Sequence, residues 1–109
     1  MFAGTEFTIG GEKFVVPTLS LGQLRQGLIE KLRLHDELVA AGKAIEALDI
    51  RGQVILAAIR RNYPDFAEAK IWENLDMANV HEIWLAVLGM SGLQQGEAAA
   101  APKSETNGT

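Results

Sequence analysis

The strongest constraint on the fold is the segment 45–63, which is apolar around most of its circumference when drawn as a helix. Its apolar positions are Ile45, Leu48, Ile50, Val54, Ile55, Leu56, Ala58, Ile59 and Tyr63. The narrow strip left between them holds Gln53, Ala57, Arg60 and Arg61. A helix with this pattern packs against neighbours on more than one side. We therefore expect a central helix, broken at Pro64, which disfavours helical geometry at Tyr63.

A β-hairpin is predicted near the N-terminus, over residues 5–16. Phe7 and Ile9 alternate with polar residues, and Gly10-Gly11 supplies the positive φ that tight hairpin turns need. Phe14 and Val16 form a matching apolar face on the second strand. Pro17 ends that strand because it has no N–H for a further ladder bond. A lone hairpin is marginally stable in water, so this one must pack on helices.

A first helix is predicted to begin at about Leu21. Ser20 and Gln23 have the spacing of a capping box, and the apolar face consists of Leu21, Leu24, Leu28 and Leu32. The sequence allows two positions for the end of this helix. It can continue to Gly42, a suitable C-cap, or it can stop at His35-Asp36, where a second helix would start.

Two shorter helices are predicted after Pro64. Asp65 is expected to cap the first, over residues 66–74, with Glu68 at the capping-box position. Asp76 or Asn79 caps the second, whose apolar stripe is Val80, Ile83, Trp84, Val87 and Leu88. Gly89 and Gly92 mark its end.

The composition changes after Leu93, where residues 93–109 contain four consecutive alanines and no aromatic or β-branched aliphatic residue. We expect a disordered tail there. The chain of 109 residues then has one compact domain, residues 1–92. The fold class is mostly helical α+β, with the hairpin packed on about four helices.

Charge and cysteine content exclude several classes of protein. The net charge of −4 argues against nucleic-acid binding through broad phosphate neutralisation, and the absence of cysteine excludes disulfides and thiolate chemistry. The uncharged run 83–93 is far shorter than the ~20 residues of a membrane-spanning helix. The N-terminal residues lack the pattern of a secretory signal. We expect a cytosolic protein that binds neither nucleic acid nor membrane.

No constellation of catalytic residues is visible in the sequence. His35 and His81 fall in different predicted helices with no partners at a metal-ligand spacing, and we expect both on solvated helix surfaces. Ser20 is explained by capping and Ser91 by helix termination. The sequence therefore predicts no enzyme, no metal and no cofactor.

Three aromatic residues, Phe66, Trp72 and Trp84, lie in the last third of the predicted domain 1–92. They can fill the core of a small domain. Alternatively, part of this apolar surface is exposed and docks a partner, because aromatic residues dominate binding hot spots.

Three segments together resemble the bacteriophage tail assembly chaperones. They are PTLSLGQL at 17–24, which leads from the hairpin into a helix, RNYPD at 61–65, and VLGMSGL at 87–93 before the low-complexity tail. The resemblance implies a chaperone that binds the tape measure protein, a long and largely helical phage protein, and keeps it soluble while the tail tube assembles. It also implies the cytoplasm of the host cell, absence from the finished virion and no catalytic residues. The tail tube protein and further copies of the chain are open as additional partners.

Helix-in-groove recognition suits such a client, with Phe66, Ile71, Trp72, Ile83 and Trp84 as the expected partner-binding residues. A structural tail-completion or head-to-tail connector subunit is the alternative, because the same apolar surface could make permanent subunit contacts. A small DNA-binding regulator is a third reading, with a helix-turn-helix around Pro64. The acidic residues of the last two predicted helices count against it.

Overall fold

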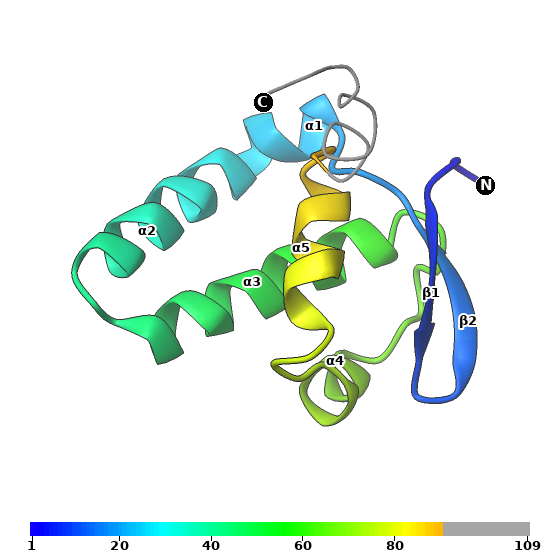
Figure 1. Cartoon of the computed structure of the whole chain (residues 1–109). Coiled ribbons are helices and arrows are strands. Elements are labelled where there is room, and N and C mark those ends of the chain that lie inside the picture. Colours follow the sequence, from blue (N-terminus) through cyan, green and yellow to red (C-terminus); the bar gives the residue numbers. More distant parts are fainter. Residues whose placement is uncertain (91–109) are drawn as a thin grey trace, which may run out of the picture.

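The computed structural model describes residues 1–90. It contains a two-stranded antiparallel hairpin and four helical segments (Figure 1), which confirms the predicted mostly helical α+β fold. The strands are β1 (Thr5–Ile9) and β2 (Glu12–Val16). The first helical segment consists of α1 (Leu21–Gln23), the π-helical turn η1 (Leu24–Leu28) and α2 (Ile29–Ala40), and the other three are α3 (Ala44–Ile59), α4 (Glu68–Asn74) and α5 (Val80–Val87). The tail predicted for 93–109 and the boundary at residue 92 lie outside the described residues.

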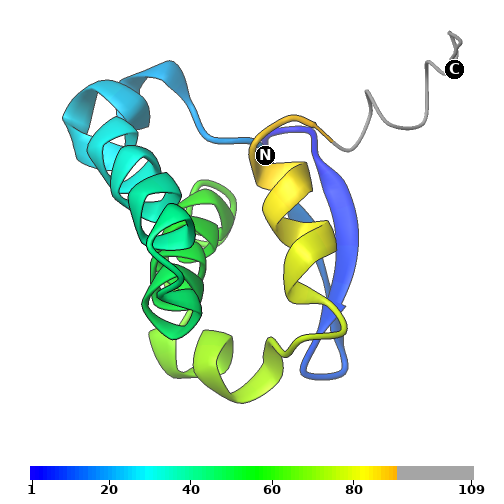
Figure 2. The ribbon, with the colours of Figure 1, turned by 60° about the vertical axis from the view of Figure 1, so that its left-hand side comes forward.

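Helix α3 is the centre of the fold. The side chains of Val54, Ile55 and Ile59 are completely buried. Helix α2 packs antiparallel to α3, and α5, α4 and β2 contact α3 as well (Figure 1). Figure 2 shows α1 to α2 on one side of the molecule, with α5 and the hairpin on the other. Most of the apolar circumference read from the sequence is therefore covered by several different neighbours, as predicted, but Ile45 at its start is 79% exposed.

The hairpin has the predicted apolar face. Phe7 pairs with Phe14 across the two strands, and Ile9, Phe14 and Val16 are buried against the helices. Gly10 and Gly11 have φ of 61° and 83°, the positive values that the two-residue turn requires.

The residues that follow α3 hold the hairpin. The backbone N–H of Val15 donates to the Tyr63 hydroxyl over 2.9 Å, and the Asn62 amide nitrogen donates to the carbonyl oxygens of Phe2 and Val15, each over 2.9 Å. The ring of Tyr63 also packs edge-on against Phe14, with centroids 5.1 Å apart. Helix α3 ends at Ile59, four residues before the predicted end, because these residues leave the helix to make contacts with the hairpin.

The first helical segment starts with the predicted capping box. The Gln23 N–H donates to the Ser20 hydroxyl and the Ser20 N–H donates to the Gln23 amide oxygen, each over 3.0 Å. The segment continues through α2 to Ala40, and Gly42 follows with φ of 76°. Of the two end positions that the sequence allows, the later one, near Gly42, is correct.

Leu21 does not join the apolar face of this segment, contrary to prediction, and its side chain is 80% exposed. The π-helical turn η1 lies between it and α2, and Gly27 within η1 has φ of 129°. Because this backbone geometry is not helical, the segment is kinked at Gly27, and the positions before the kink are turned relative to those after it. Leu28 and Leu32 still pack against the core.

The predicted N-cap at Asp65 is wrong. Helix α4 begins at Glu68, with Ala67 at the N-cap and no side-chain cap bond. The chain first forms a turn at Pro64, and the Arg60 guanidinium holds the carbonyl oxygen of Phe66 at 3.0 Å, which keeps this stretch out of the helix.

Both cap candidates for α5 take part in its start. The Asp76 carboxylate accepts bonds from the N–H groups of Ala78 and Asn79 over 2.9 and 3.1 Å. The Asn79 side-chain oxygen accepts from the Asp76 N–H over 2.9 Å. Asn79 is the N-cap by position, while Asp76 orders the turn before it.

His35 is buried, so its predicted place on a solvated surface is wrong. It is 5% exposed and accepts a bond from Arg51 Nε at its Nε2 over 2.9 Å. The centroid of its ring lies 4.7 Å from that of Trp84 on α5, and the Cζ atom of Arg51 lies 5.0 Å from the centroid of the same indole. Burial lowers the pKa of the Arg51 guanidinium, because the charge loses hydration. His81, in contrast, is exposed as expected.

Replacing His35 by alanine should lower the free energy of unfolding by about 2 kcal/mol, because it opens a gap against Trp84 and leaves Arg51 Nε without its acceptor. Urea denaturation measures the change. Leu34→Ala is the matched control. The Leu34 side chain is next to His35 in sequence and 44% exposed, so we expect the free energy of unfolding to change by no more than about 0.5 kcal/mol. Equal losses in the two variants would contradict a specific role for the His35 contact.

Candidate functional site

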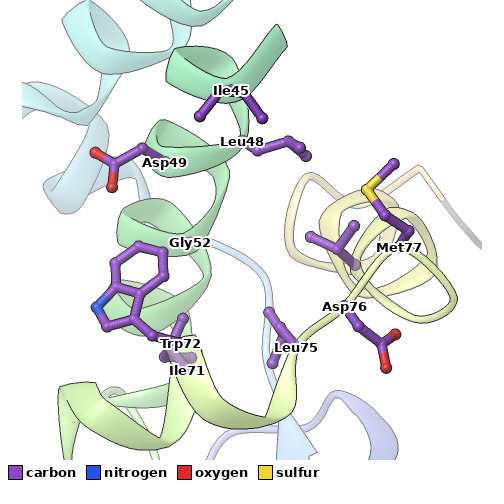
Figure 3. A pocket seen from close by; sticks show the side chains of 10 residues that line it. Ile45, Leu48, Asp49, Gly52, Ile71, Trp72, Leu75, Asp76 and Met77 are labelled. Carbon is purple, nitrogen blue, oxygen red and sulfur yellow. The ribbon is translucent and has the colours of Figure 1, made fainter.

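An apolar groove opens between α3, α4 and the turn that leads into α5 (Figure 3). Its volume is about 420 Å³, within the range of pockets that bind ligands or side chains. The groove is lined by Ile45, Leu48, Asp49, Gly52, Ile71, Trp72, Leu75, Asp76, Met77 and Val80. It is open to solvent on one side, so it can admit a row of side chains from a partner.

Trp72 forms one wall of the groove and is 46% exposed. Its indole N–H donates to the Glu68 carboxylate one turn earlier on α4, over 3.1 Å, which fixes the orientation of the ring. The six-membered ring of the indole lies against α3 at Gly52, where a Cβ atom would overlap its Cζ3 and Cη2 carbons. Gly52 is therefore the residue that lets Trp72 lie in this position.

Three large apolar side chains are exposed around this one hollow. Ile45 is 79% exposed and Met77 is 76% exposed, in addition to Trp72. Fully burying a side chain of this size is worth about 1.5–3 kcal/mol relative to leaving it in water. A partner that covers the groove gains part of that free energy at each of the three positions.

The structure places the five predicted partner-binding residues in two different environments. Ile71 and Trp72 line the groove, Ile71 at its buried base. Phe66 packs edge-on against Phe14, with ring centroids 5.1 Å apart, and Ile83 and Trp84 are buried in the core. In this structure those three do not reach the groove. The apolar face of α5 packs against α3, so Trp84 lies in the core and does not line the groove.

Eight residues that line the groove were not proposed as binding residues from the sequence: Ile45, Leu48, Asp49, Gly52, Leu75, Asp76, Met77 and Val80. Ile45 and Leu48 belong to the stretch that reads as a buried helix. Gly52 did carry a signal, because an isolated glycine within an apolar helix indicates a close approach by another group. Met77 is an apolar residue inside the polar turn between the two cap candidates of α5.

The charges at the groove are negative. Asp49 and Asp76 are the charged residues that line it, and no lysine or arginine is among the lining residues that the structure describes. Asp49 accepts a bond from the neutral Gln53 amide over 2.6 Å. The groove thus combines an apolar base with acidic edges.

Within residues 1–90, no three side chains of the metal-ligating types come close enough together to hold an ion. No helix in that range has the length and hydropathy needed to cross a bilayer. No protein-family model, curated protein or solved structure matches this chain.

Gly52→Ala should displace the Trp72 ring, because the added methyl group occupies the space of the indole. The tryptophan emission should shift to longer wavelength as the ring moves into water. The unfolding free energy should change by no more than about 1 kcal/mol, since the gain in helix propensity offsets the lost contact. Gly22→Ala is the control, because its methyl group would meet only the Ser20 hydroxyl, at 3.8 Å. An unchanged emission spectrum in Gly52→Ala would contradict the proposed role of this glycine.

Proposed function

We propose that this chain is a bacteriophage tail assembly chaperone, which binds the tape measure protein and keeps it soluble during tail assembly. The single observation that carries the proposal is the open apolar groove with three exposed large side chains, Ile45, Trp72 and Met77, at its edge. An exposed apolar surface favours aggregation of a monomeric protein, but in a chaperone it can bind the apolar surface of a client.

The shape of the groove suits a helical client. A helix that lies in a groove inserts side chains at positions i, i+3, i+4 and i+7. Helix α3 presents Ile45 and Leu48 on one side, and α4 presents Trp72 and Leu75 on the other (Figure 3). A row of apolar side chains can lie between these two helices.

The contact surface also suits a client with many similar segments. Met77 and Ile45 are exposed and free to adapt, and the thioether chain of methionine fits varied partners. The base of the groove, in contrast, is rigid, because Ile71 is buried and Trp72 is held by Glu68. The acidic net charge of −4 helps to keep a loaded complex soluble.

The residues of the resemblance serve the fold. The 17–24 segment contains the capping box of the first helical segment, and the 61–65 segment begins with the clamp on the hairpin. Gly89, in the third segment, has φ of 76° just after α5. The three segments therefore stabilise the fold that positions the groove, and the groove residues make the contacts with the client.

Co-expression with the tape measure protein of its own phage tests the proposal. We expect the wild-type chain to move most of the client into the soluble fraction. The double variant Ile45→Glu/Met77→Glu should lose at least about half of that effect, because both changes place charges on the apolar contact surface while both side chains are already exposed. Leu34→Glu/Val39→Glu on α2 is the matched control, since these side chains are 44% and 52% exposed and lie outside the groove.

A client that is equally insoluble with and without this chain would reject the chaperone function. Mass spectrometry of purified virions separates the alternative: a chain found there at ring stoichiometry is a structural tail-completion or connector subunit. A chaperone is found in the lysate and not in the virion.

A further inference from the structure

We propose that the groove selects by charge, and that its occupant is a basic amphipathic helix whose apolar face is flanked by lysine or arginine. This inference rests on the proposed function, since it concerns the same groove. It adds the chemistry of the client segment, which the chaperone function alone leaves open.

The first observation is the placement of the two carboxylates. Asp49 lies on α3 and Asp76 on the turn before α5, so they come from opposite edges of the groove (Figure 3). Both are exposed, while the residues at the base between them are apolar. A helix seated between the edges would bring the residues on both sides of its apolar face close to a negative charge.

The second observation is that neither carboxylate forms a salt bridge within residues 1–90, where Lys31 donates instead to the Gln53 amide oxygen over 2.8 Å. The Asp49 partner is the Gln53 amide, and the Asp76 carboxylate accepts bonds from the backbone N–H groups of Ala78 and Asn79. The ion pairs found within residues 1–90 use other carboxylates, Glu30 and Glu12, and the Asp36 carboxylate contacts His35 Nδ1 over 3.1 Å. The charge at the edges is therefore available to a ligand.

The spacing on α3 fits this arrangement. Ile45 and Asp49 are four residues apart, so they lie on neighbouring turns of one helix face. The apolar contact and the acidic contact follow one another along the edge of the groove. A client helix with the complementary order, an apolar residue and then a cation about one turn later, matches both.

Charge also decides against a second copy of this chain as the occupant. In a symmetric contact the same patch meets itself, so the acidic edges of one copy would lie against the acidic edges of the other. Like charges brought together in this way oppose association. A basic segment gains from the same edges.

Two designed peptides of about 18 residues test the proposal on the full chain. Both have the same leucine face, one flanked by lysine and the other by glutamate. Calorimetry at about 50 mM salt should give at least about 10-fold tighter binding for the lysine peptide, and the difference should shrink below about 3-fold at about 500 mM salt. Ile45→Glu/Met77→Glu should weaken binding of the lysine peptide, which places it in the groove.

Asp49→Lys should reduce the preference for the lysine peptide at least about 3-fold. Glu37→Lys is the matched control: it makes the same change of charge at an exposed position on α2 that does not line the groove, and the preference should persist. Equal effects of the two variants would assign the preference to net charge and overturn the proposal.

The outcomes also separate this inference from the function on which it rests. If both peptides bind equally well to the wild-type chain, charge selection is wrong and the groove remains a site for apolar helices. If neither peptide binds, helix binding by the groove is wrong as well.

Discussion

The rest of the structure depends on the need to cover α3 on nearly all sides. With Val54, Ile55 and Ile59 completely buried, this helix cannot stand at the surface, and α2, α4, α5 and β2 each cover one sector of it. The small hairpin gains stability from the same packing, because two strands alone cannot hold themselves in water. The domain is thus organised around one helix, with the hairpin and the other helices as its cover.

Polar contacts then decide where the covering elements lie. Asn62 and Tyr63 bond to the backbone of the hairpin just beyond the end of α3. Nearer its middle, Arg51 bonds to His35 on α2 and lies over Trp84 on α5, so that one side chain contacts two elements. Apolar packing is non-directional, and these bonds supply the direction.

The groove exists because this cover is incomplete. Helix α4 is short and lies against α3 at Gly52, where the indole of Trp72 takes the space of a side chain. Beyond that contact, Ile45 near the start of α3 and Met77 before α5 are left exposed. The two tryptophans therefore differ in role: Trp84 fills the core, and Trp72 forms a wall that a partner can contact.

The sequence by itself determined the features that depend on near neighbours in the chain. Gly10-Gly11, the Ser20 and Gln23 capping box, and the apolar circumference of 45–63 each predict a local structure that the fold contains. Only the tertiary structure decided that His35 is buried, that Phe66 and Trp84 belong to the core and that Ile45 and Met77 are exposed. Periodicity shows which face of a helix is apolar, but whether that face is covered depends on elements distant in sequence, whose position is set by packing. The candidate binding surface combines the part of α3 that the other elements of the described fold leave uncovered, at Ile45, with the exposed side chains of Trp72 on α4 and Met77 before α5.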